Sequence, residues 1–173
     1  MKEMIKELNI KKLIFVFLCM VNLSCSSSKK TISKNQVNVL NTILHSSEYS
    51  IYYKTIINNG TSFKKPIEEY ITDNLEFQFC ESDIINKSEI VFLRKEFKNQ
   101  KVKNLNKLQL NYSENLTKNK KIFETSFISI PILFRNNTMA IYYNTQTYGG
   151  NFTLLEKRDS EWKIICSSLV WIE

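Results

Sequence analysis

The last fifty residues constrain the fold most, because apolar runs alternate there with tight-turn residues. Four β-rich runs occupy residues 123–134, 139–147, 152–157 and 162–172. Residues that favour tight turns separate the runs, at 135–138, 149–150 and 158–160. Short strands joined by tight turns pair antiparallel. The C-terminal half is therefore predicted to form an antiparallel β-meander of four or more strands.

Two details refine this prediction. Pro131 interrupts the first run, which indicates a strand edge or a bulge, because proline cannot donate to the ladder. Both faces of the last run are partly apolar. One face is expected to carry Trp162, Ile164, Cys166, Ser168 and Val170, and the other Ile165, Leu169 and Trp171. We therefore expect helices or loops to cover more than one side of the sheet.

About three helices are expected to pack on this sheet. The first spans residues 35–46, where Ser33 and Gln36 have the spacing of a capping box. The second spans residues 65–75, with Pro66 at its start. The third begins at Ser88 and ends near residues 99–100. The predicted fold class is therefore α+β.

Shorter elements are expected upstream of the meander. Residues 48–57 and 75–80 are predicted strands, and Asn59-Gly60 is a turn signal. Leu108 and Leu110 alternate with polar residues, which favours a short edge strand.

The first 24 residues have the pattern of an export leader. Four lysines precede the apolar run of residues 13–21, and small or polar residues follow it. Nine apolar residues are too few to span a bilayer, which takes roughly 20. Residues 1–24 are therefore predicted to be a signal peptide, residues 25–32 a tether, and residues 33–173 a single domain.

The end of this leader, Leu23-Ser24-Cys25, resembles the lipobox of bacterial lipoproteins. The resemblance implies that Cys25 carries a diacylglyceryl group and becomes the first residue. The protein would then be exported and held at the cell envelope through the lipid on Cys25. The tether is Ser-rich and basic, which favours a periplasm-facing orientation. Asn22 stands where the family has an aliphatic residue, so an ordinary leader with Cys25 incidental is the alternative.

Two cysteines belong to the predicted domain. In an oxidising compartment, Cys80 and Cys166 form either a disulfide or two separate buried thiols. The mature chain holds one histidine and no Cys-x-x-Cys spacing, so we expect no metal site and no cofactor.

No pattern of residues indicates catalysis. His45 ends the first predicted helix, where a cation favours the helix dipole. No Gly-x-Ser-x-Gly motif accompanies it. The acidic pairs Glu68-Glu69 and Glu81 with Asp83 are typical of solvated surface. We assign no catalytic residue, and a non-enzymatic role is favoured.

Positive charge and tyrosine are each concentrated in places. Residues 94–121 hold nine Lys or Arg and two Glu, a local charge of +7. This segment either attracts anionic headgroups or is a solvated surface of a Lys-rich chain. Nucleic acid is a poor partner, because serial stacking aromatics are lacking and the protein is exported. Five tyrosines lie at positions 52, 53, 142, 143 and 148. They are expected either to line a pocket, to form an interface, or to belong to the core and the sheet surface.

The C-terminal half resembles a group of uncharacterised exported bacterial proteins. The resemblance rests on residues 129–134, 140–143, 149–150, 152–157, 162–164 and 169–172. It implies export and brings no activity. The Trp162-Lys163-Ile164 strand is also similar to the NTF2-like fold, whose cone binds small ligands.

Two functions follow as expectations. The first is a membrane-anchored module that binds a protein, a glycan or another envelope component. The alternative is an NTF2-like ligand-binding or enzymatic domain. Convergent polar groups in a pocket would favour the second, and a filled core with an aromatic surface patch would favour the first.

Overall fold

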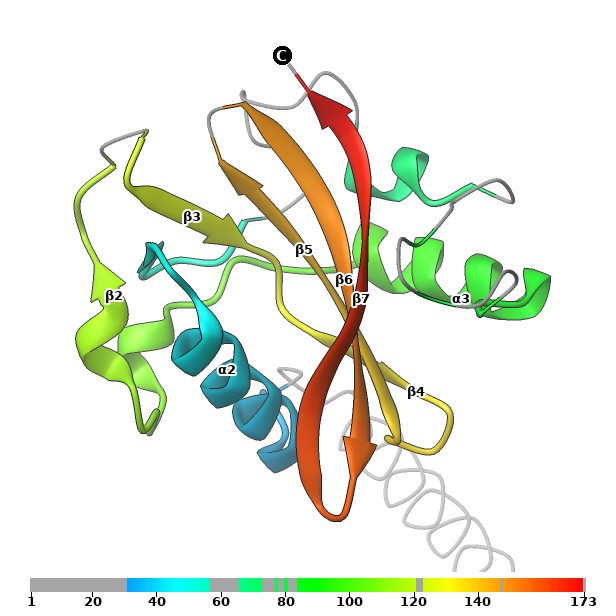
Figure 1. Ribbon diagram of the computed structural model, residues 1–173, viewed down its shortest axis with the longest axis horizontal. Coiled ribbons are helices and arrows are strands. Elements are labelled where there is room, and N and C mark those ends of the chain that lie inside the picture. Colours follow the sequence, from blue (N-terminus) through cyan, green and yellow to red (C-terminus); the bar gives the residue numbers. More distant parts are fainter. Residues whose placement is uncertain are drawn as a thin grey trace, which may run out of the picture. The chain divides into compact units, whose positions relative to one another are not determined.

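The computed structural model describes residues 31–56, 66–72, 77, 80, 84–120, 123–146 and 148–172. These residues form an α+β fold, in which a seven-stranded mixed sheet is accompanied by two α-helices, α2 (Lys34–Ser46) and α3 (Lys87–Lys98) (Figure 1). The strands are β1 (Ser50–Tyr52), β2 (Leu116–Thr117), β3 (Thr125–Ile128), β4 (Ile132–Phe134), β5 (Met139–Gln146), β6 (Gly149–Arg158) and β7 (Glu161–Ile172). Short 3₁₀ helices are η1 (Ile67–Tyr70), η2 (Leu105–Lys107) and η3 (Ser113–Asn115).

The sheet is only partly the predicted meander. Its strand order is β2-β1-β3-β5-β6-β7, and β4 also pairs with β5. Strands β5, β6 and β7 form consecutive antiparallel hairpins, as expected. Strand β1, however, pairs parallel with both β2 and β3. Parallel pairing needs a long crossover, and the chain that contains α3 supplies it between β1 and the two later strands.

The predicted helices are confirmed at two places and corrected at the third. The Ser33 and Gln36 side chains form the expected capping box of α2. Helix α3 also forms, but its N-cap is Asn86, and Glu89 completes the capping box, so Ser88 lies within the first turn. In the described part of residues 65–75 the structure has only η1, which ends as Ile71 adopts an extended conformation.

Three predicted strands or turns need correction. Residues 123–134 form two strands, because the segment around Pro131 leaves the ladder between β3 and β4. Gly149 and Gly150 lie inside β6 and do not form a turn. Leu108 and Leu110 are not in a strand, and the edge strand is β2 instead. The strand predicted at 75–80 and the turn at Asn59-Gly60 lie outside the described residues, apart from Phe77 and Cys80.

Two of the three predicted tight turns of the meander are confirmed, at residues 135–138 and within residues 158–160. Arg135, Asn136 and Asn137 have φ of 48°, 54° and 63°, and Asp159 and Ser160 have φ of 48° and 70°. Asn and Asp tolerate this left-handed conformation better than other non-glycine residues. These turns therefore fix the β4–β5 and β6–β7 hairpins.

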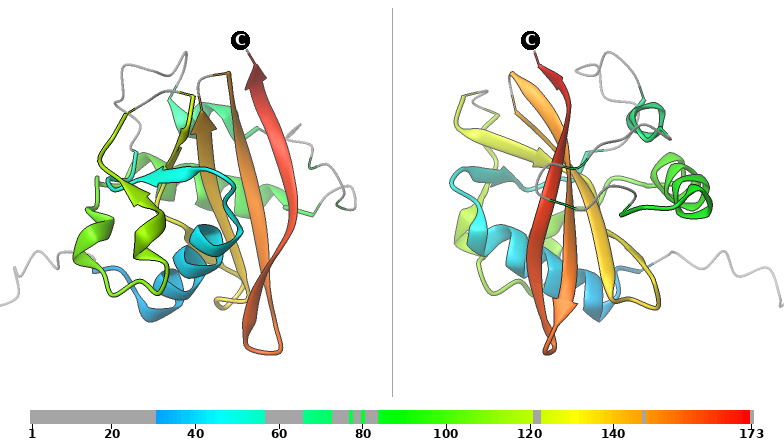
Figure 2. Two further views of the ribbon diagram at one scale, coloured as in Figure 1. Left: turned by 60° about the vertical axis from the view of Figure 1, so that its left-hand side comes forward. Right: turned by 45° about the vertical axis from the view of Figure 1, so that its right-hand side comes forward.

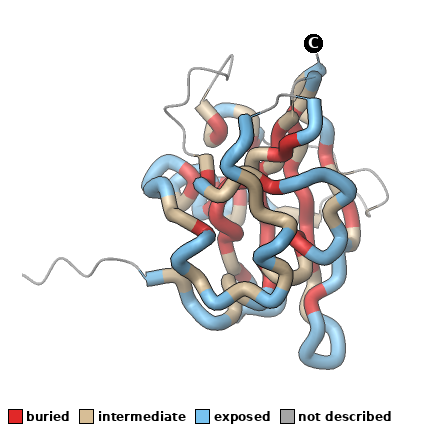
Figure 3. The backbone as a smooth tube through the Cα atoms, turned by 90° about the vertical axis from the view of Figure 1, so that its left-hand side faces the viewer, coloured by how far each residue is buried: buried red, intermediate tan, exposed pale blue. Residues whose placement is uncertain are grey.

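The helices lie on opposite sides of the meander (Figure 2). On the α3 side, residues from α3, η1 and alternate strand positions form one apolar cluster; it includes Phe97, Ile71, Ile141, Phe152 and Leu154. On the other side, α2 buries Val39, Leu40, Ile43 and Leu44. Buried positions accordingly recur along the strands, while the hairpin ends are exposed (Figure 3).

Two irregularities in β7 change the predicted faces of this strand. Leu155 of β6 pairs with Ile164 of β7, and Leu154 pairs with Cys166, so Ile165 has no partner in this register. A second register shift lies between Asn151 and Gly150 of β6. A bulge places an extra residue in one strand and lets neighbouring side chains share a face. Ile165 and Cys166 consequently both pack in the α3-side cluster. The predicted alternation from Trp162 to Val170 is therefore wrong, because Trp162 pairs with Lys157 on the α2 side.

Candidate binding pocket

A shallow pocket lies where β5 ends and β6 begins. Its volume is about 240 Å³, and its described lining is Asn144, Gln146, Tyr148, Gly149, Gly150, Asn151 and Leu169. Strand pairing brings most of these residues together: Asn144 lies opposite Asn151, and Asn151 lies opposite Leu169. The same pairing puts their side chains on the α2 side of the sheet.

Three carboxamides give the pocket its polar character. Gln146 donates from Nε2 to the Ser126 hydroxyl at 2.8 Å, and Asn151 donates from Nδ2 to the Thr153 hydroxyl at 3.3 Å. Both amide carbonyls keep acceptor capacity beyond these bonds. The Asn144 Oδ1 atom is buried and has no hydrogen-bond partner among the described residues. Leaving a buried acceptor unsatisfied costs about 1–3 kcal/mol of stability.

The rim of the pocket is apolar and exposed. Leu169 is 51% exposed and Tyr148 is 60% exposed. The Tyr148 ring contacts Phe123, itself 69% exposed, with 5.8 Å between ring centroids. None of the described lining residues carries a charge at neutral pH. The pocket therefore offers amide hydrogen bonds and aromatic surface to an uncharged ligand.

Hydrogen bonds from neighbouring strand residues hold the backbone around the pocket in place. The Thr145 hydroxyl donates to the Gly149 carbonyl oxygen at 2.9 Å, which ties the end of β5 to the start of β6. Behind the pocket, the Trp171 indole N–H donates to the Tyr143 hydroxyl oxygen at 2.6 Å. A Cβ atom on Gly150 would overlap both groups, so only glycine fits there. Burial raises the pKa of Tyr143 to about 12.

The five tyrosines noted in the sequence have separate roles. Tyr142 and Tyr143 are buried core residues. Burial also raises the pKa of Tyr142. Tyr52 and Tyr53 are half-buried on β1 and directly after it, and Tyr148 lines the pocket. The carboxamides were not singled out from sequence, because isolated Asn and Gln residues in strands carry no distinctive spacing.

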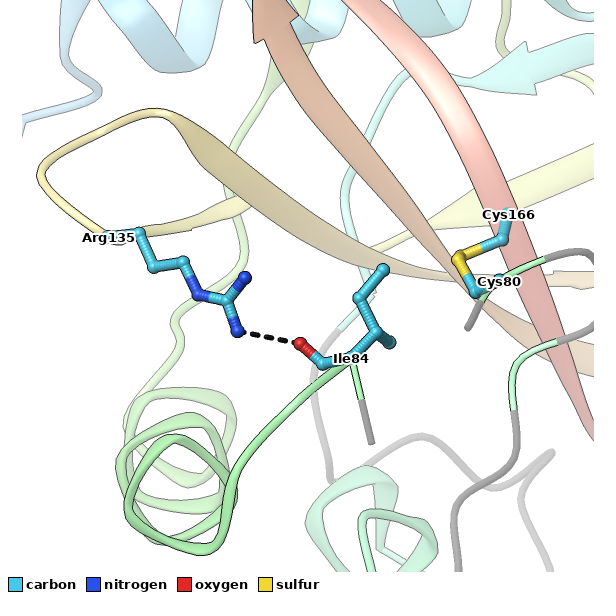
Figure 4. The surroundings of a disulfide bond; sticks show 4 residues. All are labelled: Cys80, Ile84, Arg135 and Cys166. Atoms are coloured by element: carbon cyan, nitrogen blue, oxygen red, sulfur yellow. Dashed lines mark hydrogen bonds between the residues drawn. A yellow bond between two sulfur atoms is a disulfide. The ribbon is translucent and has the colours of Figure 1, made fainter. Parts of the chain in front are cut away.

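The predicted cysteine pair is joined in the structure. Cys80 and Cys166 form a disulfide between the segment before α3 and the centre of β7, with 5.7 Å between their Cα atoms (Figure 4). Nearby, Arg135 donates to the Ile84 carbonyl oxygen at 2.6 Å and pairs with Glu89 at 2.6 Å. The hydrogen bonds to Arg135 are the main reason that the pKa of Glu89 is lowered. The predicted lipidation residue, Cys25, lies outside the described residues.

The remaining candidate residues do not converge on a reactive centre. His45 is exposed in the last turn of α2, and its ring contacts Tyr112 at 4.7 Å between centroids. Glu68 and Glu69 lie in η1, whereas Glu81 and Asp83 lie outside the described residues. Among the residues that the structure describes, no cluster of three or more His, Cys, Asp or Glu could hold a metal ion.

Comparisons with protein-family models, with curated proteins and with solved structures return no match. In the described part of the chain, no helix combines the length and apolar character needed to cross a membrane.

Proposed function

We propose that the protein is an exported lipoprotein whose domain binds a neutral glycan of the cell envelope in the pocket between β5 and β6. The observation that carries this proposal is the convergence of Asn144, Gln146 and Asn151 beside the exposed Tyr148 ring, without a charged lining residue. Carboxamides both donate and accept hydrogen bonds, which matches hydroxyl and acetamido groups. The Tyr148 ring offers apolar area to the face of a sugar ring.

The size of the pocket limits the ligand. At about 240 Å³ it is smaller than the roughly 300–1,000 Å³ typical of sites for drug-sized molecules. One sugar unit would therefore occupy the pocket, and flanking units would extend over Phe123 and Leu169. The lining supports binding in preference to catalysis, because its described residues include no carboxylate, histidine, lysine, cysteine or serine side chain.

One sequence feature and one structural feature support the placement at the envelope. The leader that ends in Leu23-Ser24-Cys25 supports lipidation at Cys25, and two acyl chains hold a protein stably at a bilayer. A disulfide between Cys80 and Cys166 suits an exported protein.

The test of the anchor is Cys25→Ser. We expect wild-type protein in the membrane fraction with an acylated Cys25 by mass spectrometry, and the variant in the soluble fraction. Membrane retention of the variant would contradict the anchor.

The binding test uses amide NMR spectra of the protein with N-acetylglucosamine trimer as the probe. We expect shifts concentrated at the described pocket residues, and their loss in Asn151→Leu. Asn38→Leu is the matched control, because Asn38 is exposed on α2 outside the pocket lining. Equal weakening in both variants, or shifts spread elsewhere, would contradict glycan binding in this pocket.

A small-ligand carrier is the second candidate function. The observation that favours it is the same small volume with three convergent polar side chains. This candidate predicts that a small molecule copurifies with the protein and is released by Asn144→Leu. Mass spectrometry of the denatured, purified protein distinguishes it from glycan binding.

A further inference from the structure

The basic segment seen in the sequence does not form one surface. Its first cations, Arg94, Lys95 and Lys98, lie exposed on α3. Its last described cations, Lys118 and Lys120, follow β2 at one edge of the sheet, away from α3 (Figure 1). Strand β2 pairs with β1, and this pairing brings Lys118 and Lys120 close to a second set of residues after β1.

That second set contributes two aromatic rings and a third lysine. We call Tyr52, Tyr53, Lys54, Lys118 and Lys120 the Tyr–Lys edge. The Lys120 ammonium lies 5.5 Å from the centroid of the Tyr52 ring, and the Lys54 ammonium lies 5.2 Å from that of Tyr53. The two rings contact each other edge to face at 4.9 Å. The Tyr–Lys edge is thus one contiguous group built from the ends of β1 and β2 and the residues that follow them, two segments far apart in sequence.

The electrostatics agree with this grouping. The Lys54 ammonium lowers the pKa of the Tyr53 phenol, and Lys118 adds to the effect. All three lysines are exposed. Neither of the described salt bridges involves them, since these bridges join Arg135 to Glu89 and Arg158 to Glu156. Their positive charge is therefore presented to the solvent beside partly exposed tyrosine rings.

We propose that the Tyr–Lys edge docks onto the anionic lipid headgroups of the membrane that anchors the chain. All its cations are lysines, which act as point charges and suit a fluid layer of phosphates better than a single, geometrically fixed ligand. Tyrosine favours the boundary between headgroups and acyl chains. This inference rests on the proposed lipid anchor, which keeps the domain near the bilayer.

Because the predicted tether keeps the domain near the membrane, a weak contact with the headgroups is sufficient to orient it. Residues 25–32 are eight residues, which reach at most roughly 26–29 Å when extended. A domain held within this distance meets the surface at high effective concentration, so a modest attraction sets its orientation. Docking through β1 and β2 would leave the β5–β6 pocket on another part of the sheet available to envelope glycans.

The test is cosedimentation of the full, unacylated chain with vesicles, at 0.1 M salt. Vesicles of phosphatidylcholine alone are compared with vesicles that contain about one third phosphatidylglycerol. The test variant is K54S/K118S/K120S. The matched control is K87S/K95S/K98S, which removes the same charge from exposed positions of α3. We expect binding to the anionic vesicles to fall about tenfold or more in the test variant and less than twofold in the control.

Two results would contradict the proposed membrane docking. Similar losses in both variants would mean that net charge alone acts, and this would overturn the docking surface. Loss of binding to a soluble polyanion, polyglutamate, without any loss of vesicle binding would assign the edge to an acidic macromolecule and overturn the membrane proposal. Because the chain is unacylated, these outcomes do not depend on Cys25, whose modification is tested separately by fractionation and mass spectrometry.

Discussion

The two faces of one sheet end differ sharply. On the α3 side, Tyr143, Trp171 and Gly150 fit so closely that a single methyl group on Gly150 would overlap its neighbours. On the α2 side of the same strands, Asn144 and Asn151 border an open pocket, and one carboxamide oxygen is left without a described partner. Alternation along β5 and β6 thus separates residues that stabilise the fold from residues that are available for binding.

Together with the proposed function, the comparison predicts that stability and binding can be altered independently. Changes on the α3 side should alter the free energy of unfolding, and changes on the pocket side should alter binding. The predictions below test this separation, beginning with the largest expected effect.

Replacing both cysteines, as C80A/C166A, should have the largest effect on stability. The disulfide links residues 86 apart and attaches the segment before α3 to the α3-side cluster. Closing a loop of this length stabilises a protein by about 4.6 kcal/mol in the chain-entropy description. Chemical denaturation with and without reductant measures the loss. Reductant should destabilise the wild type and leave the variant unchanged; an equal response in both would contradict the disulfide's role.

Gly150→Ala should be the next largest, destabilising by about 2–3 kcal/mol, because overpacking forces Tyr143 and Trp171 to move. Gly149→Ala is the comparison, since its Cβ would lie 3.0 Å from the Trp171 carbonyl oxygen and 3.8 Å from Leu169. It should cost less than Gly150→Ala. Urea unfolding curves give both values, and equal costs would show that the α3 side is not tightly packed.

Tyr143→Phe should destabilise by about 1–2 kcal/mol, because the Trp171 N–H loses its acceptor. It should also alter the alkaline limb of stability. Since the pKa of Tyr143 is raised from 10.0 to about 12 in the folded state, the unfolded chain binds fewer protons between these pH values. The free energy of unfolding therefore falls as pH rises through this window. The fall should be shallower in Tyr143→Phe, and an unchanged slope would contradict the burial of this phenol.

Arg135→Ala should have the smallest effect, about 0.5–1 kcal/mol, because its partner Glu89 is mostly covered but Arg135 is 39% exposed. Arg158→Ala, which removes a more exposed pair, should cost less. The lowered pKa of Glu89 means that this stabilisation is present above its ordinary pKa of 4.5 and is lost as pH falls below it. Thermal unfolding at pH 7 and pH 3 measures it. A larger destabilisation by Arg135→Ala at pH 3 than at pH 7 would contradict this prediction.

Much of the meander could be predicted from sequence, for physical reasons that particular residues illustrate. Asn136-Asn137 and Asp159 mark turns locally, and Ser33 with Gln36 marks a helix start within four residues. The parallel pairing of β1 could not be predicted, because the pairing partners lie far apart in the chain. Gly149-Gly150 misled the prediction because glycine serves close packing as well as turns.

The candidate site was harder to predict than the fold. Asn151 joins Asn144 and Gln146 only through the β5–β6 register, which sequence alone does not fix. The bulge at Ile165 likewise moved Cys166 and Trp162 to opposite faces, although their spacing of four residues predicts a shared one. The cysteine pair was one of two alternatives from sequence, and the structure joins the two residues in a disulfide.

The separation of the two faces is tested most directly by measuring stability and glycan binding together in N144L/N151L. Replacing these carboxamides by apolar side chains of similar size removes the pocket's hydrogen-bonding groups and the unpartnered Asn144 oxygen. We predict a free energy of unfolding within about 1 kcal/mol of the wild type, or higher, together with at least a tenfold weaker affinity for N-acetylglucosamine trimer. A loss of several kcal/mol with unchanged binding would contradict the account.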